Sequence, residues 1–201
     1  MRVTSWIAII VAFSLLLGFS AVLAETRPPM QTVKERIDQI ITVLNDPQYH
    51  APAKKEAQRD KIWEIASPMF DFMEISRRTV GSNWEKFTEE EKERFTAIFT
   101  RFLGNSYIDK MQGEYHNEQI VYVKELVREP QALVQTRLVR EGAGMPIDYR
   151  MKLEDGEWKI YDILVENGVS IVQNYRVQFQ SILQKEPPSH LIKRLEDKLK
   201  A

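Results

Sequence analysis

Apolar residues recur every three or four positions through the first half of the chain, which is the pattern of amphipathic helices. The predicted helices cover residues 33–44, 53–66, 69–81 and 88–111. The first ends at "NDP" (45–47), because the residue before a proline avoids helical geometry, and the third ends at Gly81. A capping box, in which Thr88 is followed three residues later by Glu91, marks the start of the longest helix.

After Gly113 the apolar pattern changes to alternation, which is typical of strands. Strands are predicted over 119–127, 132–140, 146–154 and 158–166, and helices over 169–183 and 191–199. The strand connections are short, so neighbouring strands should run antiparallel as a meander. The pattern predicts an α+β domain whose N-terminal helices pack under a curled four-stranded antiparallel sheet. The opening of such a sheet is a common place for an apolar pocket.

The fourth predicted strand carries large apolar residues on both faces. Regular alternation would place Trp158, Ile160, Asp162 and Leu164 on one face, and Tyr161, Ile163 and Val165 on the other. Both faces of this strand are therefore expected to be covered by other elements.

The first 24 residues have the pattern of a cleaved signal peptide. Arg2 precedes an uncharged apolar run over 6–19, and Val22 and Ala24 are small residues at the offsets of a cleavage site. The alternative is an uncleaved anchor, but the run is shorter than the roughly 20 apolar residues of a spanning helix. We expect residues 1–24 to be removed and residues 25–201 to form a single domain in the periplasm.

Composition restricts the classes of function. The chain has 28 Lys and Arg, 29 Asp and Glu, and no cysteine, so neither disulfides nor attachment of a lipid to cysteine is expected. The near-neutral charge argues against a nucleic-acid partner, which would require a basic face. His50, His116 and His190 are far apart and lack ligand spacing, so no metal site is expected. No self-association repeat is visible, which favours a monomer.

Four segments carry a resemblance that runs in order over nearly the whole chain after the predicted signal. They are "FDFMEISRRTVGSNW" (70–84), "TEEEKERF" (88–95), "DGEWKIYDILVENGVSIVQNYRVQF" (155–179) and the "SIL" that follows (181–183). The chain resembles the MlaC family of periplasmic phospholipid-binding proteins, also called toluene-tolerance proteins. The resemblance implies a nuclear-transport-factor-like cone with a lipid cavity and a single lipid-binding domain of MlaC type over 25–201.

The same resemblance implies a carrier and not an enzyme. The carrier would move phospholipid between an outer-membrane lipoprotein and porin complex and an inner-membrane ABC transporter complex with its lipid-shuttling ring. This transport would maintain outer-membrane lipid asymmetry. No cofactor is implied, and phospholipid would be the cargo.

The candidate tail-binding residues are apolar or aromatic side chains of the longest helix, the third and fourth strands and the helix over 169–183. They are Phe99, Leu103, Tyr107, Met111, Tyr149, Met151, Tyr161, Ile163, Val165, Val169, Val172, Tyr175 and Phe179. Met and Tyr suit variable acyl chains because they adapt to irregular surfaces. The stripe of Phe95, Phe99, Leu103, Tyr107 and Met111 on the longest helix suits an ordinary core equally well, since cores and pockets share composition.

Arginines are the candidates for headgroup contacts. Glu74 precedes Arg77 and Arg78 by three and four residues, so local ion pairing is the simpler interpretation for those two. Arg176 could contact a headgroup, or it could anchor its helix to the sheet through Asp162.

Two other classes of function remain alternatives. One is a small periplasmic enzyme that uses Asp162 as a general base with Tyr149 nearby. The other is a protein-binding adaptor that uses the last helix and the aromatic surface.

Overall fold

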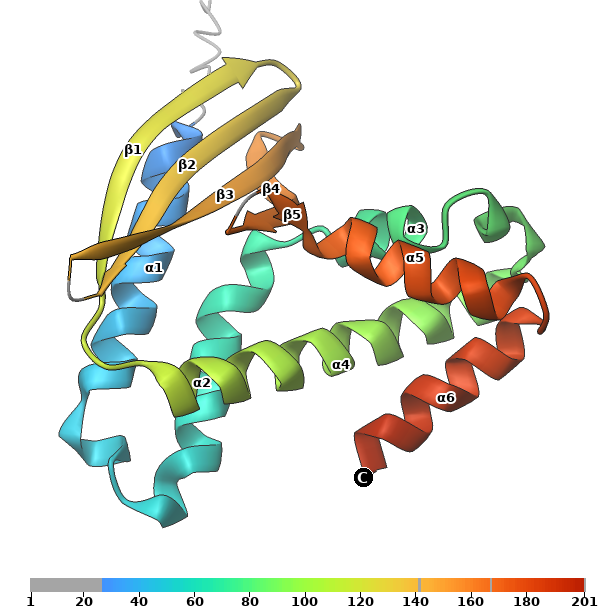
Figure 1. The fold of residues 1–201 in the computed structure, drawn as a ribbon, viewed down its shortest axis with the longest axis horizontal. Helices are drawn as coiled ribbons and strands as arrows, with labels where there is room; N and C mark the ends of the chain where they lie inside the picture. The colour runs from blue at the N-terminus through green and yellow to red at the C-terminus, as the bar shows by residue number, and fades with distance from the viewer. Residues whose placement is uncertain (1–26, 141, 167, 201) are drawn as a thin grey trace, which may run out of the picture.

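The computed structural model describes residues 27–140, 142–166 and 168–200, and the predicted signal peptide lies outside them. These residues form six α-helices and a five-stranded sheet. The helices are α1 (Pro29–Asn45), α2 (Lys55–Ala66), α3 (Phe72–Val80), α4 (Glu89–Glu114), α5 (Ile171–Leu183) and α6 (Pro188–Lys200), with short 3-10 segments η1 (Pro47–Tyr49), η2 (Pro52–Lys54), η3 (Ser67–Met69) and η4 (Gly81–Lys86). The curled sheet lies at one end of the molecule, and α2 to α6 extend away from it (Figure 1).

The sheet is an antiparallel meander with the order β1-β2-β3-β4-β5. Its strands are β1 (Gln119–Arg128), β2 (Gln131–Arg140), β3 (Ala143–Glu154), β4 (Glu157–Val165) and β5 (Val169–Ser170). The predicted α+β class and meander are confirmed, but the predicted number of four strands is wrong. The fifth strand has two residues, which pair with Leu164 and Val165, and two residues are too few to show a period in the sequence.

The N-termini of two helices are fixed by the side chains that precede them. Thr88 Oγ1 accepts from the Glu91 N–H at 3.1 Å while the Glu91 carboxylate accepts from the Thr88 N–H at 3.0 Å, which confirms the predicted capping box of α4. Asp71 caps α3, and its own N–H donates to the Ile160 carbonyl at 3.0 Å. The second bond holds the start of α3 against β4.

Strand β4 contains a β-bulge that changes which face its side chains occupy. Met151 pairs with Ile160 but Arg150 pairs with Asp162, so Tyr161 is the extra residue. The bulge interrupts the alternation, and Ile163 therefore packs against the same core cluster as Ile160. The expectation that Ile160 and Asp162 share a face is wrong for this reason.

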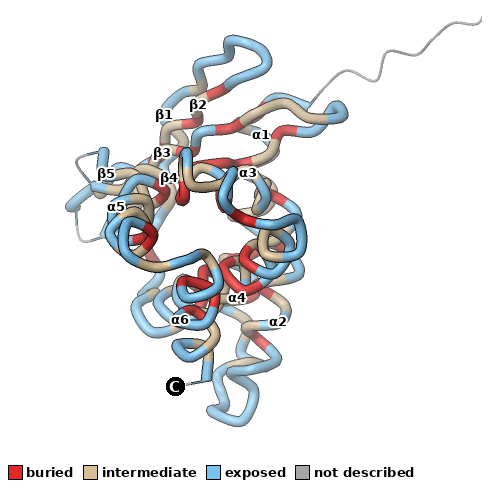
Figure 2. The backbone as a smooth tube through the Cα atoms, turned by 90° about the vertical axis from the view of Figure 1, so that its right-hand side faces the viewer, coloured by how far each residue is buried: buried red, intermediate tan, exposed pale blue. Residues whose placement is uncertain are grey.

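The described residues bury their apolar side chains in three clusters. The helical cluster joins α3, η4, α4, α5 and α6 around the stacked rings of Phe95 and Phe99. The sheet cluster packs Val33 of α1 against the inner face of the strands, including Met151. The α2 cluster, around Ile62, joins α1, α2 and the end of α4. Buried positions accordingly lie on the inward sides of the helices and strands (Figure 2).

Candidate functional site

The predicted tail-binding residues are divided among the three clusters. Phe99, Leu103, Val172 and Phe179 are buried in the helical cluster, and Tyr149 and Met151 in the sheet cluster. Tyr107 and Tyr175 are half-buried at the edge of the helical cluster, Ile163 at the edge of the sheet cluster, and Met111 at the edge of the α2 cluster. Val165 is half-buried, Tyr161 is buried, and Val169 is 53% exposed. The buried members pack here as core, and contact of any of these residues with lipid stays a prediction.

Three aromatic residues connect the clusters, and we call them the aromatic seam: Trp63, Phe70 and Phe72. Phe70 packs against both the helical and the sheet cluster. Its ring stacks on Phe72 with centroids 5.5 Å apart, and Phe72 in turn lies 5.6 Å from Trp63 of the α2 cluster. All three rings are only half-buried. The boundary between the clusters is therefore apolar and partly accessible.

Sequence reasoning did not include the aromatic seam among the candidates. Phe70 and Phe72 flank the capping residue Asp71 where η3 passes into α3, at the start of the helix predicted over 69–81. The sequence offered two signals for them: a pair of aromatic residues surrounds a helix cap, and both residues lie in the segment 70–84 that carries the family resemblance.

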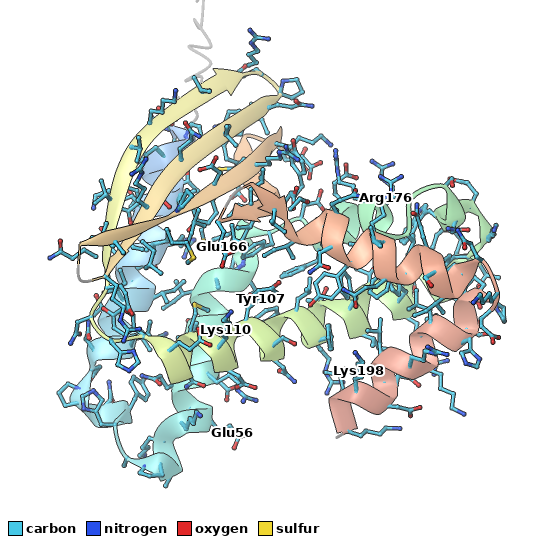
Figure 3. All side chains as sticks on the ribbon, viewed as in Figure 1. Glu56, Tyr107, Lys110, Glu166, Arg176 and Lys198 are labelled. Carbon is cyan, nitrogen blue, oxygen red and sulfur yellow. The ribbon has the colours of Figure 1, made fainter. Side chains whose placement is uncertain are left out.

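Two tyrosines from different helices lie together at the edge of the helical cluster. Tyr107 is on the side of α4 that faces α5 and the sheet (Figure 3). Burial raises the pKa of its phenol, and the neighbouring Tyr175 phenol adds to the rise. Burial also raises the pKa of Tyr175, although Tyr107 acts in the opposite direction. Both phenols are therefore neutral at pH 7, and their rings can border hydrocarbon while the hydroxyls keep polar partners.

Asp162 is a structural junction between the sheet and α5. Its carboxylate accepts from Ser170 Oγ at 2.7 Å, from the Val172 N–H at 3.1 Å and from Arg150 Nη1 at 3.2 Å. The side chain is only 4% exposed. The carboxylate thus connects β3, β4 and the first turn of α5.

These bonds decide two of the sequence hypotheses. The expected anchor of α5 at Asp162 exists, but Arg150 supplies the guanidinium and Arg176 does not. Tyr149 packs into the sheet cluster, whereas Asp162 bonds across the opposite face of the strands. The pair proposed for general-base chemistry is therefore not brought together.

The predicted ion pairs of α3 are present. Glu74 accepts two hydrogen bonds from Arg77 at 2.8 Å and one from Arg78 at 2.7 Å. Burial acts to raise the pKa of Glu74, but the bonds from the two arginines outweigh it, and the pKa is lowered.

The surface of the described residues includes two open grooves. The first, of about 420 Å³, is lined by Gly168, Val169, Ser170, Gln173, Asn174 and Val177. The second, of about 380 Å³, is polar and is lined by residues of α3, η4 and α5. Val169 is the one predicted tail-binding residue that lines either groove. No described helix is long and apolar enough to span a membrane, and no group of three metal-ligating side chains occurs among the described residues.

The MlaC protein family model matches residues 34–197. The chain belongs to the MlaC family. A curated relative, toluene tolerance protein ttg2D of Pseudomonas putida, is 25% identical over 174 residues, which are 85% of this chain and 80% of the relative. The resemblance read from the four segments is thereby confirmed.

The fold is also shared with a solved structure that contains a phospholipid. The structure of a phospholipid-binding protein from Ralstonia solanacearum in complex with a phospholipid superposes with a TM-score of 0.72 at 21% identity. The match covers 85% of this chain and 96% of the other. The helices and curled sheet described above are thus a fold that this chain shares with the Ralstonia protein.

Proposed function

We propose that this chain is a periplasmic phospholipid carrier. It would shuttle lipid between an outer-membrane lipoprotein and porin complex and an inner-membrane ABC transporter complex with its lipid-shuttling ring, and so maintain outer-membrane lipid asymmetry. Family membership supports the proposal, as does the fold shared with a protein solved in complex with phospholipid. The signal-peptide pattern of residues 1–24 is consistent with the periplasm.

A carrier of this kind solves a simple energetic problem. A phospholipid with about 30 acyl methylenes, at ~0.8 kcal/mol each, would require on the order of 24 kcal/mol to expose its tails to water. A protein that covers the tails removes most of this barrier. The charged headgroup can stay in water at the surface, where it needs only weak polar contacts.

The division of the core into three clusters is the observation that carries the proposal. A domain of this size usually has one contiguous core with small satellite clusters. Here the buried apolar side chains form three separate clusters, and half-buried apolar rings lie at the boundaries between these clusters. We place the acyl chains along the aromatic seam, between the sheet and α4. There they would contact Tyr107, Met111, Ile163 and Tyr175.

The surface grooves do not suit acyl chains. The first groove, at the start of α5, offers Val169 and Val177 as its apolar lining and is open to solvent. A site that binds a ligand tightly covers most of the ligand's surface. In our account the clusters therefore separate at the seam when lipid enters, and the rings of Trp63, Phe70 and Phe72 turn to cover it.

The proposal requires no chemistry on the lipid, because the cargo is released unchanged. Asp162 agrees with this, since its carboxylate already accepts three hydrogen bonds that hold α5. The functional role of the interior is then to cover hydrocarbon and not to transfer protons.

Lipid transfer between vesicles tests the function. Protein stripped of lipid is added to donor vesicles that contain a fluorescent phospholipid. A porous membrane, which protein can cross but vesicles cannot, separates the donor vesicles from the acceptor vesicles. We expect the acceptor fluorescence to rise at a rate proportional to protein concentration. A rate equal to that of buffer would contradict the proposal.

A further inference from the structure

Three arginines from two helices meet in the polar groove between α3, η4 and α5. Its lining residues are Arg77, Arg78, Gly81, Ser82, Trp84, Glu85 and Arg176. Figure 3 shows Arg176 on the opposite side of α5 from Tyr107. The groove is therefore separate from the seam where we place the tails, and a ligand could bind there whether or not the protein carries lipid.

Gly81 allows Arg176 to enter this groove. Its backbone has φ +57° and ψ −132°, a conformation that residues other than glycine rarely adopt. A Cβ at this position would lie 2.7 Å from Arg176 Nη2. The backbone angle requires glycine, and the absence of a Cβ leaves room for the flexible guanidinium of Arg176 against the end of α3.

Two of the three arginines in the groove are paired with a carboxylate, and the third is available to bind a ligand. Arg77 and Arg78 share the single carboxylate of Glu74, with N–O distances of 2.8 and 2.7 Å. Arg176 is half-buried, yet it takes part in none of the ion pairs or side-chain hydrogen bonds found among residues 27–140, 142–166 and 168–200. Glu85 is the one carboxylate among the lining residues of the groove and is exposed. The guanidinium of Arg176 keeps its N–H donors for an external acceptor.

We propose that this groove is a binding site for a phosphate group, carried either by a lipid headgroup at a membrane surface or by a soluble phosphate compound. A guanidinium presents two parallel N–H donors that match the oxygens of a phosphate, and arginine is favoured where such pairing matters. Arg176 is the principal ligand. Arg77 and Arg78, partly neutralised by Glu74, supply the positive surroundings, and the Ser82 hydroxyl is a further donor.

Titration with inorganic phosphate at constant ionic strength tests the site, with the arginine Nε–H signals followed by NMR. We expect saturable binding that weakens about tenfold in Arg176→Gln, since a charge-assisted pair is lost. Arg101→Gln on the exposed side of α4 removes the same charge elsewhere and should leave binding unchanged. Glu85→Gln removes a repelling carboxylate and should strengthen binding, which also tests the site if Arg176→Gln does not fold.

Vesicle sedimentation distinguishes the two sources of phosphate. Wild-type protein and Arg176→Gln are compared on phosphatidylcholine vesicles with and without phosphatidylglycerol. Phosphate binding together with Arg176-dependent binding to the phosphatidylglycerol vesicles identifies a headgroup site. Phosphate binding without vesicle binding identifies a site for a soluble compound. If neither probe binds more tightly to wild type than to Arg176→Gln, or if Glu85→Gln does not strengthen phosphate binding, the proposal is overturned.

Discussion

The backbone N–H of Val172 donates a hydrogen bond of 3.1 Å to the carboxylate of Asp162, so the first turn of α5 is attached directly to the bulged strand β4. Two further bonds to the same carboxylate, from Ser170 and Arg150, make Asp162 the point at which sheet and helices are joined. This junction sets the position of α5, which carries both Tyr175 on its inner side and Arg176 on its outer side.

Asp162→Ala should destabilise the fold by about 3 kcal/mol, because it leaves several buried donors without an acceptor. Urea unfolding at pH 7 measures the change. Asp148→Ala is the matched control, since Asp148 lies on the neighbouring strand and accepts one bond, from Gln135 at 2.9 Å. We expect the control to lose about 1 kcal/mol. Equal losses in the two variants would show that Asp162 is not the junction described here.

Ile163→Glu should remove bound phospholipid while the protein stays folded. Ile163 is half-buried at the edge of the sheet cluster, and a carboxylate there would face hydrocarbon, which lowers lipid affinity by more than about tenfold. Val172 suits this test less well, because it is 9% exposed within the helical cluster and a charge there would disturb the core.

Val123→Glu is the control for this lipid test. Val123 is an aliphatic residue of β1 that is 50% exposed, far along the sheet order from Ile163. Lipid content after extraction is measured in both variants, with circular dichroism to confirm folding. Retained lipid in a folded Ile163→Glu protein would mean that the tails lie elsewhere.

Gly81→Ala should destabilise the protein by about 2 kcal/mol, mainly through backbone strain and to a smaller extent through displacement of the flexible Arg176 guanidinium. Gly156→Ala separates the two causes, because Gly156 also has a positive φ of +80° but a Cβ there would meet nothing within 4 Å. That variant should lose about 1 kcal/mol. Adding Arg176→Ala to Gly81→Ala should recover part of the difference. No recovery would contradict the close approach of Arg176 to Gly81.

Glu74 should make stability depend on pH in the acid range. Its pKa is lowered in the folded state from an ordinary value of 4.5, so its contribution is fully present above that value and is lost as the pH falls through the folded pKa. Unfolding free energies of wild type and Glu74→Gln should therefore differ most near neutrality and converge on acidification below about pH 4.5. A difference that is constant from pH 7 to pH 3 would contradict the ion pairs with Arg77 and Arg78.

The sequence predicted those parts of the fold that depend on local patterns. The capping box of Thr88 and Glu91 placed the start of α4, and alternating residues placed four of the five strands. The ion pairs of Glu74 were also predictable, because partners three and four residues apart share one helix face.

Features that depend on pairing between distant segments were not predictable. The extra residue of the β4 bulge, Tyr161, becomes visible only when the register with β3 is known. The choice of Arg150 over Arg176 as partner of Asp162 follows from the same register. The division of the interior into three clusters likewise depends on how α1, α2 and the sheet are placed, which no single segment encodes.

Native mass spectrometry of protein expressed with the predicted signal peptide in place and purified without detergent tests the central claim most directly. The account predicts that the folded protein carries an added mass equal to that of a phospholipid, which is released when the protein is denatured. Folded protein observed at the mass of the polypeptide alone, in fresh periplasmic extracts that contain phospholipid, would contradict it.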